Sequence, residues 1–279
     1  MSEKKELTIR SLMANDLVKQ KFQEILGKNA PAFISSVTTL ATTSALVECE
    51  PKSILSAAIA AASLNLQVNP SLGQACILPY KDKTGIIKAQ FQIMKKGFIQ
   101  LALRSGQFKN INVTEVYAGE LKVVNRLTGE FDLSGGKTDD KIIGYAAYFK
   151  LLNGFEKTLY MSIEQIIAHG KRYSKSFDLP NSLWKTDFNK AALKTALKLL
   201  LSGYAPLSVE MQTALMQDQS EIKINDNLEI TDLSYPDQKD AKNGKDDPEG
   251  PSIDPEIKLP AKRRTQQPPL FPENGSAQS

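Results

Sequence analysis

The residue types best suited to catalysis are scarce in this 279-residue chain, which has one histidine, two cysteines and one tryptophan. A histidine-based zinc site or a relay of histidines needs several imidazoles, and His169 is the single histidine of the sequence. Cys49 and Cys76 lie too far apart for a CxxC motif, and two cysteines cannot form a disulfide framework. We therefore expect no catalytic cluster, no metal and no cofactor, and a reducing compartment.

Gly136-Lys137-Thr138 resembles the end of a phosphate-binding P-loop, the motif that surrounds nucleotide phosphates. The full motif has a glycine five residues before Gly136, and that position is Phe131. No apolar strand pattern leads into this segment and no helical pattern follows it. The sequence favours a flexible turn here over a nucleotide site.

Positive charge divides the chain into two parts. The formal net charge is +4, but residues 1–225 hold 28 basic and 20 acidic residues, a net charge of +8. Residues 226–279 hold 7 basic and 11 acidic residues together with 8 of the 14 prolines. Such a composition buries too little apolar surface to compensate the entropy of ordering, so we expect a disordered acidic tail at 226–279. Residues 1–225 are the predicted folded domain.

The basic residues of the predicted domain concentrate in two segments. Residues 81–126 carry a net charge of +6 and residues 171–198 a net charge of +5. Basic clusters of this size indicate a surface for a polyanion such as nucleic acid, although lysines that only solvate exposed faces are the simpler alternative. His169 lies beside the second segment, where a surface position is the simpler interpretation and phosphate contact the alternative.

The elements that would position these charges follow from apolar periodicity. Helices are predicted at 7–26, 31–47, 51–66, 94–105, 162–173 and 182–201, with Gly203 just past the end of the last. Strands at 75–80 and 86–93 flank a polar turn, and further strands follow between 111 and 161. The predicted fold is therefore α+β, a largely antiparallel sheet with packed helices, N-terminal helices and the acidic tail. No apolar run is long enough to cross a membrane and no signal peptide is expected.

Two of these helices present stripes of polar or basic side chains opposite an apolar side. In 94–105 the stripe is Lys96, Gln100 and Arg104, and in 182–201 it is Lys190, Lys194 and Lys198. Such stripes can line a groove that follows a phosphate backbone, but ordinary amphipathic helices carry them too. Most aromatic residues of the strands are expected in the core, and base stacking is the minority alternative.

Three blocks in order give a more specific indication. Residues 63–80 (SLNLQVNPSLGQACILPY) resemble a block of the RecT family of phage and prophage single-strand annealing proteins. Lys96–Gly106 resembles its second block, and Trp184–Thr186 with Lys194–Ala196 and Pro206 resembles a third. The resemblance covers about residues 30–215, and Cys76 replaces the aromatic residue often found there.

The resemblance implies a β-β-β-α core and ATP-independent annealing of complementary single strands by a protein that is not an enzyme. It also implies homo-oligomeric rings or helical filaments on single-stranded and annealed duplex DNA. The implied partners are a five-prime exonuclease and the single-stranded-DNA-binding protein of a bacterial host, in whose cytoplasm the protein would act. Two alternatives from other classes stay open: a module that coats RNA or DNA without annealing it, and a metal-dependent nuclease.

The expected DNA contacts are basic side chains that hold phosphates and leave base edges available, as annealing of any sequence requires. The predicted residues of highest priority are Lys96, Arg104, Lys185, Lys194 and Lys198. The second set is Lys88, Lys109, Lys122, Arg126, Lys171 and Arg172. In the tail, the basic patch at 262–264 is a candidate for contact with an acidic partner, with a solvating appendage as the alternative.

Overall fold

The structure is a computed structural model that describes residues 8–43, 45–82, 84–125, 127–174, 176–180 and 182–235. Its α-helices are α1 (Ile9–Ala14), α2 (Asp16–Leu26), α3 (Ala30–Thr43), α4 (Pro51–Ser63), α5 (Lys95–Arg104), α6 (Ile163–Tyr173), α7 (Leu183–Thr186), α8 (Phe188–Tyr204) and α9 (Val209–Gln217). Its strands are β1 (Ala75–Lys81), β2 (Ile87–Ile93), β3 (Phe108–Tyr117), β4 (Val123–Asn125), β5 (Glu130–Asp132), β6 (Ile142–Leu151), β7 (Glu156–Ser162), β8 (Glu221–Ile224) and β9 (Ile230–Ser234). Short 3₁₀ turns lie at Gly27–Asn29 and Ala45–Glu48.

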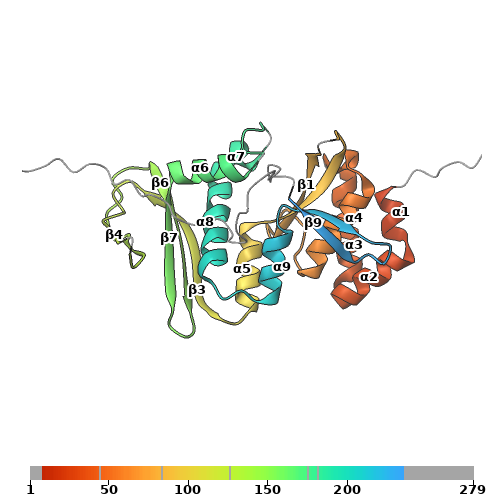
Figure 1. The fold of residues 1–279 in the computed structure, drawn as a ribbon, viewed down its shortest axis with the longest axis horizontal. Coiled ribbons are helices and arrows are strands. Elements are labelled where there is room, and N and C mark those ends of the chain that lie inside the picture. The colour runs from red at the N-terminus through yellow and green to blue at the C-terminus, as the bar shows by residue number, and fades with distance from the viewer. Residues whose placement is uncertain are drawn as a thin grey trace, which may run out of the picture.

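Every strand pairing in the described ranges is antiparallel, and the predicted α+β class is confirmed. The strands form several small sheets, namely β3-β6-β7 and the pairs β1-β2, β4-β5 and β8-β9. Figure 1 shows β3, β6 and β7 on one side of the molecule with α8 beside them, and α1–α4 with β1 on the other side. Helices α5 and α9 lie between these two parts, and α5 contacts the basic helix α8.

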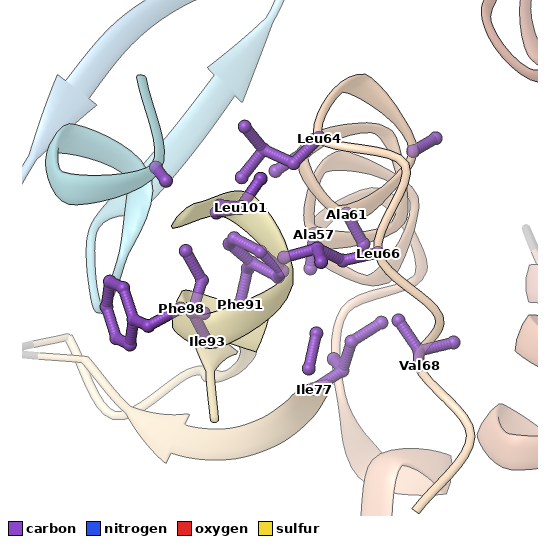
Figure 2. Close-up of a cluster of buried hydrophobic side chains, with 14 of the residues drawn as sticks. Ala57, Ala61, Leu64, Leu66, Val68, Ile77, Phe91, Ile93, Phe98 and Leu101 are labelled. Atoms are coloured by element: carbon purple, nitrogen blue, oxygen red, sulfur yellow. The ribbon is translucent and has the colours of Figure 1, made fainter. Parts of the chain in front are cut away.

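The core on the N-terminal side forms around the alanine-rich helix α4. Pro51 occupies its first turn, where a missing N–H is tolerated, and alanines from Ala57 to Ala62 are buried. Small side chains let the hairpin β1–β2 approach α4 closely, so that Phe91 and Ile93 pack between this helix and α5 (Figure 2). Burial of each such side chain contributes about 1.5–3 kcal/mol.

Two segments predicted as single helices are each two helices. The predicted helix at 7–26 is interrupted at Asn15, whose side-chain oxygen accepts a hydrogen bond from Leu17 N–H at 2.8 Å. The predicted helix at 182–201 is interrupted at Asp187, whose carboxylate accepts one from Lys190 N–H at 3.1 Å. Short polar side chains favour such N-cap positions over helix interiors, which explains both interruptions. Helix α8 also continues through Gly203 to Tyr204.

The described structure continues past residue 225, where the composition placed the start of the tail. Strand β9 pairs with β8, and the Tyr235 hydroxyl donates a hydrogen bond to the carbonyl oxygen of Met216 at 2.6 Å. Strand β8 in turn contacts α4 and β2. The remainder of the predicted tail, 236–279, lies outside the described residues.

Helix α5 meets the start of β1 through a buried glycine. A Cβ atom at Gly97 would overlap the carbonyl oxygen of Gln74 and would lie 2.8 Å from Ile93 Cγ2. That carbonyl already accepts a hydrogen bond from Met94 N–H at 2.9 Å, so it cannot move without loss of this bond. Only a glycine fits here, and the second family-like block has its glycine at this position.

We predict that Gly97→Ala lowers the free energy of unfolding by about 1–3 kcal/mol through overpacking. This loss should exceed the gain of about 1 kcal/mol that alanine has over glycine as a helix former. Gly136→Ala is the matched control, because a Cβ at Gly136 meets open space. Urea denaturation measures both variants, and equal stabilities would contradict the close contact at Gly97.

Candidate nucleic-acid interface

Helix α8 carries the second predicted stripe of lysines. Its apolar side packs on β3, β6 and β7, which turns the opposite stripe away from that sheet. Lys190, at the first turn, is exposed and pairs with the capping carboxylate of Asp187 at 2.6 Å. Lys194 is buried with 7% of its surface exposed, whereas the Lys198 side chain is 29% exposed. Three lysines with regular spacing therefore have three different environments.

A buried carboxylate explains the difference. Asp218, the residue that ends α9, is only 1% exposed. Its Oδ1 accepts hydrogen bonds from Lys194 Nζ at 3.3 Å and from the backbone N–H of Ile93 at 2.8 Å. Its Oδ2 accepts one from Lys198 Nζ at 2.7 Å. The Asp218 carboxylate thus connects α8, β2 and the end of α9. No spacing in the sequence predicted this interaction.

The two ammonium groups decide the charge state of Asp218. Burial alone would raise the pKa of this carboxyl, but Lys194 and Lys198 with the Ile93 N–H hold its pKa below the usual value. The ionised carboxylate neutralises one of the two lysines, so the cluster keeps one net positive charge. Since Lys198 is the more exposed of the pair, that charge is available to an anion at Lys198.

The end of α6 adds further positive charge near Lys198. Burial, followed by the nearby charges of Lys198 and Arg172, lowers the pKa of His169 to about 4. His169 is therefore neutral at pH 7, and its ring contacts Tyr173 with 4.6 Å between centroids. Arg172 lies over the same tyrosine ring, 5.2 Å from its centroid. The positive potential at this junction comes from Lys198, Arg172 and the exposed Lys171, and the histidine does not contribute to it at neutral pH.

The first stripe, on α5, also combines basic side chains with different partners. Lys96 is exposed and makes no ion pair within the described residues. Arg104 donates hydrogen bonds from its guanidinium to the carbonyl oxygens of Leu64 and Asn65, both at 2.7 Å. These carbonyls belong to the end of α4, where cationic donors are favourable. Arg104 therefore caps the end of α4 while its side chain stays exposed, and its positive charge is not cancelled because the carbonyls are neutral.

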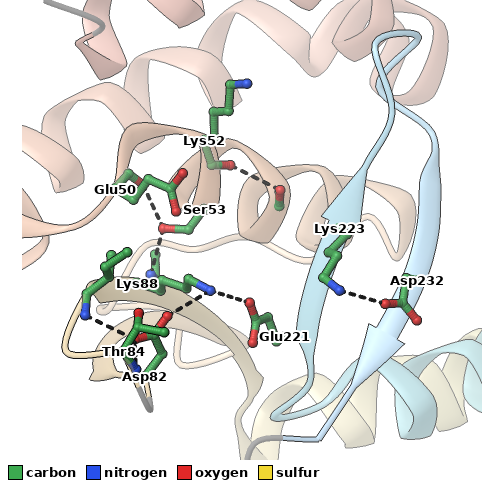
Figure 3. Close-up of polar contacts among 12 residues, drawn as sticks. Glu50, Lys52, Ser53, Asp82, Thr84, Lys88, Glu221, Lys223 and Asp232 are labelled. Carbon is green, nitrogen blue, oxygen red and sulfur yellow. Dashed lines mark hydrogen bonds and ion pairs between the residues drawn. The ribbon is translucent and has the colours of Figure 1, made fainter.

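Lys88, near the start of β2, pairs with two acidic residues. Its ammonium lies 2.5 Å from Glu221 Oε1 and 3.0 Å from Asp82 Oδ2, and the side chain is 20% exposed (Figure 3). Hydrogen bonds from Thr84 and Lys88 lower the pKa of Asp82, which keeps this carboxylate ionised. The arrangement connects the β1–β2 turn to β8 and leaves little net positive charge.

The other predicted contacts are spread over several elements. Lys185 on α7 lies 3.4 Å from Asp178 and 5.3 Å from the ring centroid of Phe177. Lys109 is exposed on β3, and Lys122, just before β4, lies 3.4 Å from the Ser134 hydroxyl. Arg126 lies outside the described residues.

The segment that resembles a P-loop end is a loop in the structure. No helix follows Thr138, as the sequence predicted, and Lys137 lies 3.8 Å above the Tyr117 ring and 2.6 Å from Asp140. Within the described ranges no group of three or more His, Cys, Asp or Glu side chains is placed to hold a metal ion. Nor does any helix there have the length and apolar character of a membrane span.

An α+β protein with cationic side chains along α5, α6 and α8 has the features of a nucleic-acid-binding protein. Residues 32–232 match the model of the RecT family. YqaK of Bacillus subtilis (strain 168), described as uncharacterized, is 42% identical over 241 residues, which are 84% of this chain and 81% of YqaK. Protein RecT of Escherichia coli (strain K12) is 30% identical over 187 residues, 63% of this chain and 66% of that protein.

The chain belongs to the RecT family, and the resemblance seen in the three sequence blocks is confirmed. Its family is one of single-strand annealing proteins that bind single-stranded DNA in phage recombination. The matched region ends at residue 232, and so includes β8 and the first part of β9.

We predict that Asp218→Asn lowers the free energy of unfolding at pH 7 by about 3–5 kcal/mol, because it leaves Lys194 buried without a counter-charge. The folded-state pKa of Asp218 is below the unfolded value of about 3.9, so the stabilisation is present above that pH and is lost as the pH falls through the folded-state pKa. The difference between wild type and variant should therefore shrink in acid. Urea denaturation at several pH values measures it.

Asp140→Asn is the control for that comparison. Asp140 also pairs with a lysine, but its side chain is 93% exposed and solvent screens the pair, so the change should leave the stability nearly unchanged at every pH. Equal losses in the two variants would mean that burial of Asp218 has no energetic consequence.

Proposed function

We propose that this chain anneals complementary single strands of DNA without ATP, holding phosphates at the junction of α6 and α8. The observation that carries the proposal is the Asp218–Lys194–Lys198 cluster, which holds Lys198 as a partly exposed cation where α8 contacts α6, the helix that carries Arg172. A cation held by a buried carboxylate needs little reordering when it binds, so less entropy is lost on binding. Its family membership supports the choice of single-stranded DNA as the polyanion.

The proposed contacts divide the predicted residues into two groups. The phosphate contacts are Lys198, Arg172, Lys171, Lys185 and Lys96, with Lys109 and Lys122 as outer contacts. Lys194 and Lys88 act mainly within the fold, because their ammonium groups pair with Asp218 and with Asp82 and Glu221 respectively. Arg104 stays among the proposed phosphate contacts, because its side chain is exposed and the neutral carbonyls of Leu64 and Asn65 do not cancel its charge. Arg126 stays in the outer group as a prediction from sequence.

Annealing requires that two polyanionic strands approach each other. Cations on the protein release condensed counterions from one strand and lower its repulsion toward the second. Contacts to phosphate carry no sequence information, so strands of any sequence are held alike. Oligomeric rings or filaments would align many such sites along one strand. A five-prime exonuclease would supply the single strands, and the host single-stranded-DNA-binding protein would cover them beforehand.

A strand-annealing assay tests this function. Labelled complementary oligonucleotides should pair faster with the protein than without it, to the same extent with and without ATP and magnesium, and the product should keep its full length. A requirement for ATP would contradict the proposal. Strand binding without faster pairing would indicate a coating module, and shortened products a nuclease.

We predict that the affinity for single-stranded DNA falls with salt at a slope of log K against log salt of about −3.5, which corresponds to about five phosphates for each subunit. The double variant Lys198→Gln with Arg172→Gln should reduce this slope by about 1.4, since two phosphate contacts are lost. Glutamine keeps a hydrogen-bond donor for Asp218, which limits the effect on stability. Fluorescence anisotropy at several salt concentrations measures the slope.

Lys19→Gln provides the matched control, because Lys19 is an exposed lysine on α2, on the other side of the molecule from α8 (Figure 1). Its slope should equal that of wild type. If the double variant also kept the wild-type slope, the phosphate contacts would lie elsewhere on the protein.

The boundary of the annealing unit gives a separate prediction. A chain that ends at residue 235 should anneal naked strands like the full chain, since it retains β9 and the bond from Tyr235 to Met216. A chain that ends at residue 225 should unfold at lower urea concentration, because β8 loses its partner strand. Loss of annealing by the chain that ends at 235 would place part of the DNA-binding machinery in residues 236–279.

A further inference from the structure

The hairpin β1–β2 has a second face that the core does not use. Ile77, Phe91 and Ile93 point to the first face and are buried near α4 (Figure 2). Side chains alternate along a strand, so the residues between them share the second face. By the register of the pairing, this face carries Cys76, Leu78 and Tyr80 of β1 opposite Gln92, Gln90 and Lys88 of β2.

One end of this second face lies at the lysine pair of α8. Cys76 is the register partner of Gln92, and its sulfur lies 3.4 Å from Met94 Sδ. Burial raises the pKa of Cys76 to about 11, and the charges of Lys194 and Asp218 also act on it. Asp218 is moreover hydrogen-bonded to Ile93, the residue after Gln92. The second face of the hairpin and the cationic stripe are therefore neighbouring surfaces.

The amides on this face form an oriented chain. Gln90 donates from Nε2 to the carbonyl oxygen of Gln219 at 2.6 Å, and Gln92 donates from Nε2 to Gln90 Oε1 at 3.0 Å. A carbonyl oxygen can only accept, so the orientation of the first amide is fixed and that of the second follows. Gln219 is itself fixed by its N–H, which donates to the carbonyl oxygen of Phe91 at 3.1 Å.

The chain of amides ends at Gln92, whose side chain can still accept and donate hydrogen bonds. Gln90 is buried, whereas Gln92 is half-buried, and its Oε1 makes no hydrogen bond within the described residues. One further N–H of Gln92 is also available. Leu78, the register partner of Gln90, is 41% exposed on the same face. An oriented donor and acceptor thus lie beside an exposed apolar side chain, next to a cationic helix.

We propose that Gln92 and Leu78 form a base-contacting wall for the strand whose phosphates are held by Lys198. This inference rests on the proposed function. It adds a contact to the bases, which the phosphate-binding lysines do not touch. The amide presents both a donor and an acceptor, so it can pair with the edge of any base, and the leucine can pack on a base face. Such a contact is sequence-tolerant.

The strength of the contact suits annealing. A neutral hydrogen bond contributes about 0.5–1.5 kcal/mol net, which is weak enough for a complementary base to displace. The wall would hold bases apart from one another until a partner strand arrives, while the cations keep the backbone in place. A charged or strongly binding group at the same position would oppose the exchange.

The test compares two probes that differ only in their bases: an oligothymidylate and an abasic deoxyribose-phosphate chain of equal length. Gln92→Met keeps the length of the side chain and removes its amide. We expect it to weaken binding of oligothymidylate about threefold to tenfold, the equivalent of one hydrogen bond, and to leave binding of the abasic chain unchanged. Leu78→Ser, a second variant on the same face, should show the same selective loss.

Gln20→Met is the matched control, because Gln20 is an exposed glutamine of α2 that bonds Glu24 on its own helix. It should bind both probes like wild type. Equal binding of oligothymidylate by Gln92→Met and wild type, or equal weakening of both probes, would overturn the base-contacting wall while leaving the proposed function intact. Failure of the wild-type protein to bind either probe would instead contradict the proposed function.

Discussion

The fold depends on one buried carboxylate. An isolated ion inside a protein is costly by several kcal/mol, so Asp218 requires its two lysines and the Ile93 N–H around it. Those partners come from α8 and β2, which belong to the two parts of the molecule that α5 and α9 separate (Figure 1). The requirement to pair this charge therefore fixes how the basic helix sits against the β1–β2 hairpin.

The same requirement separates structural cations from functional ones. Lys194 and Lys198 are one helical turn apart, yet Lys194 is enclosed by the fold while the Lys198 side chain is 29% exposed. Lys88 is likewise paired with two carboxylates, whereas Arg104 is exposed and keeps its positive charge while it donates to two backbone carbonyls. A count of basic residues thus overstates the charge that a polyanion can reach, and the available cations gather where α6 meets α8.

The surface next to those cations is neutral and polar. Cationic and neutral surfaces side by side suit a DNA strand that must be both held and released. Charge attracts the backbone irrespective of sequence, whereas single neutral hydrogen bonds to bases exchange readily. In this protein the two kinds of surface meet at Asp218 and Gln219, consecutive residues that contact the lysines and the amide chain respectively. The geometry of this short segment after α9 therefore sets the distance between both surfaces.

The sequence by itself predicted whatever depends on local chemistry: the α+β class, the β1–β2 hairpin from its polar turn, the helix that begins after Ser162 and the family blocks. It also located the basic segments, because charge is a property of composition. It merged helices at Asn15 and Asp187, since apolar periodicity continues across a capping residue. Only the tertiary structure decided which lysines are available, because burial and the pairing of Asp218 with residues 20 and 24 positions away depend on non-local packing that no sequence spacing encodes.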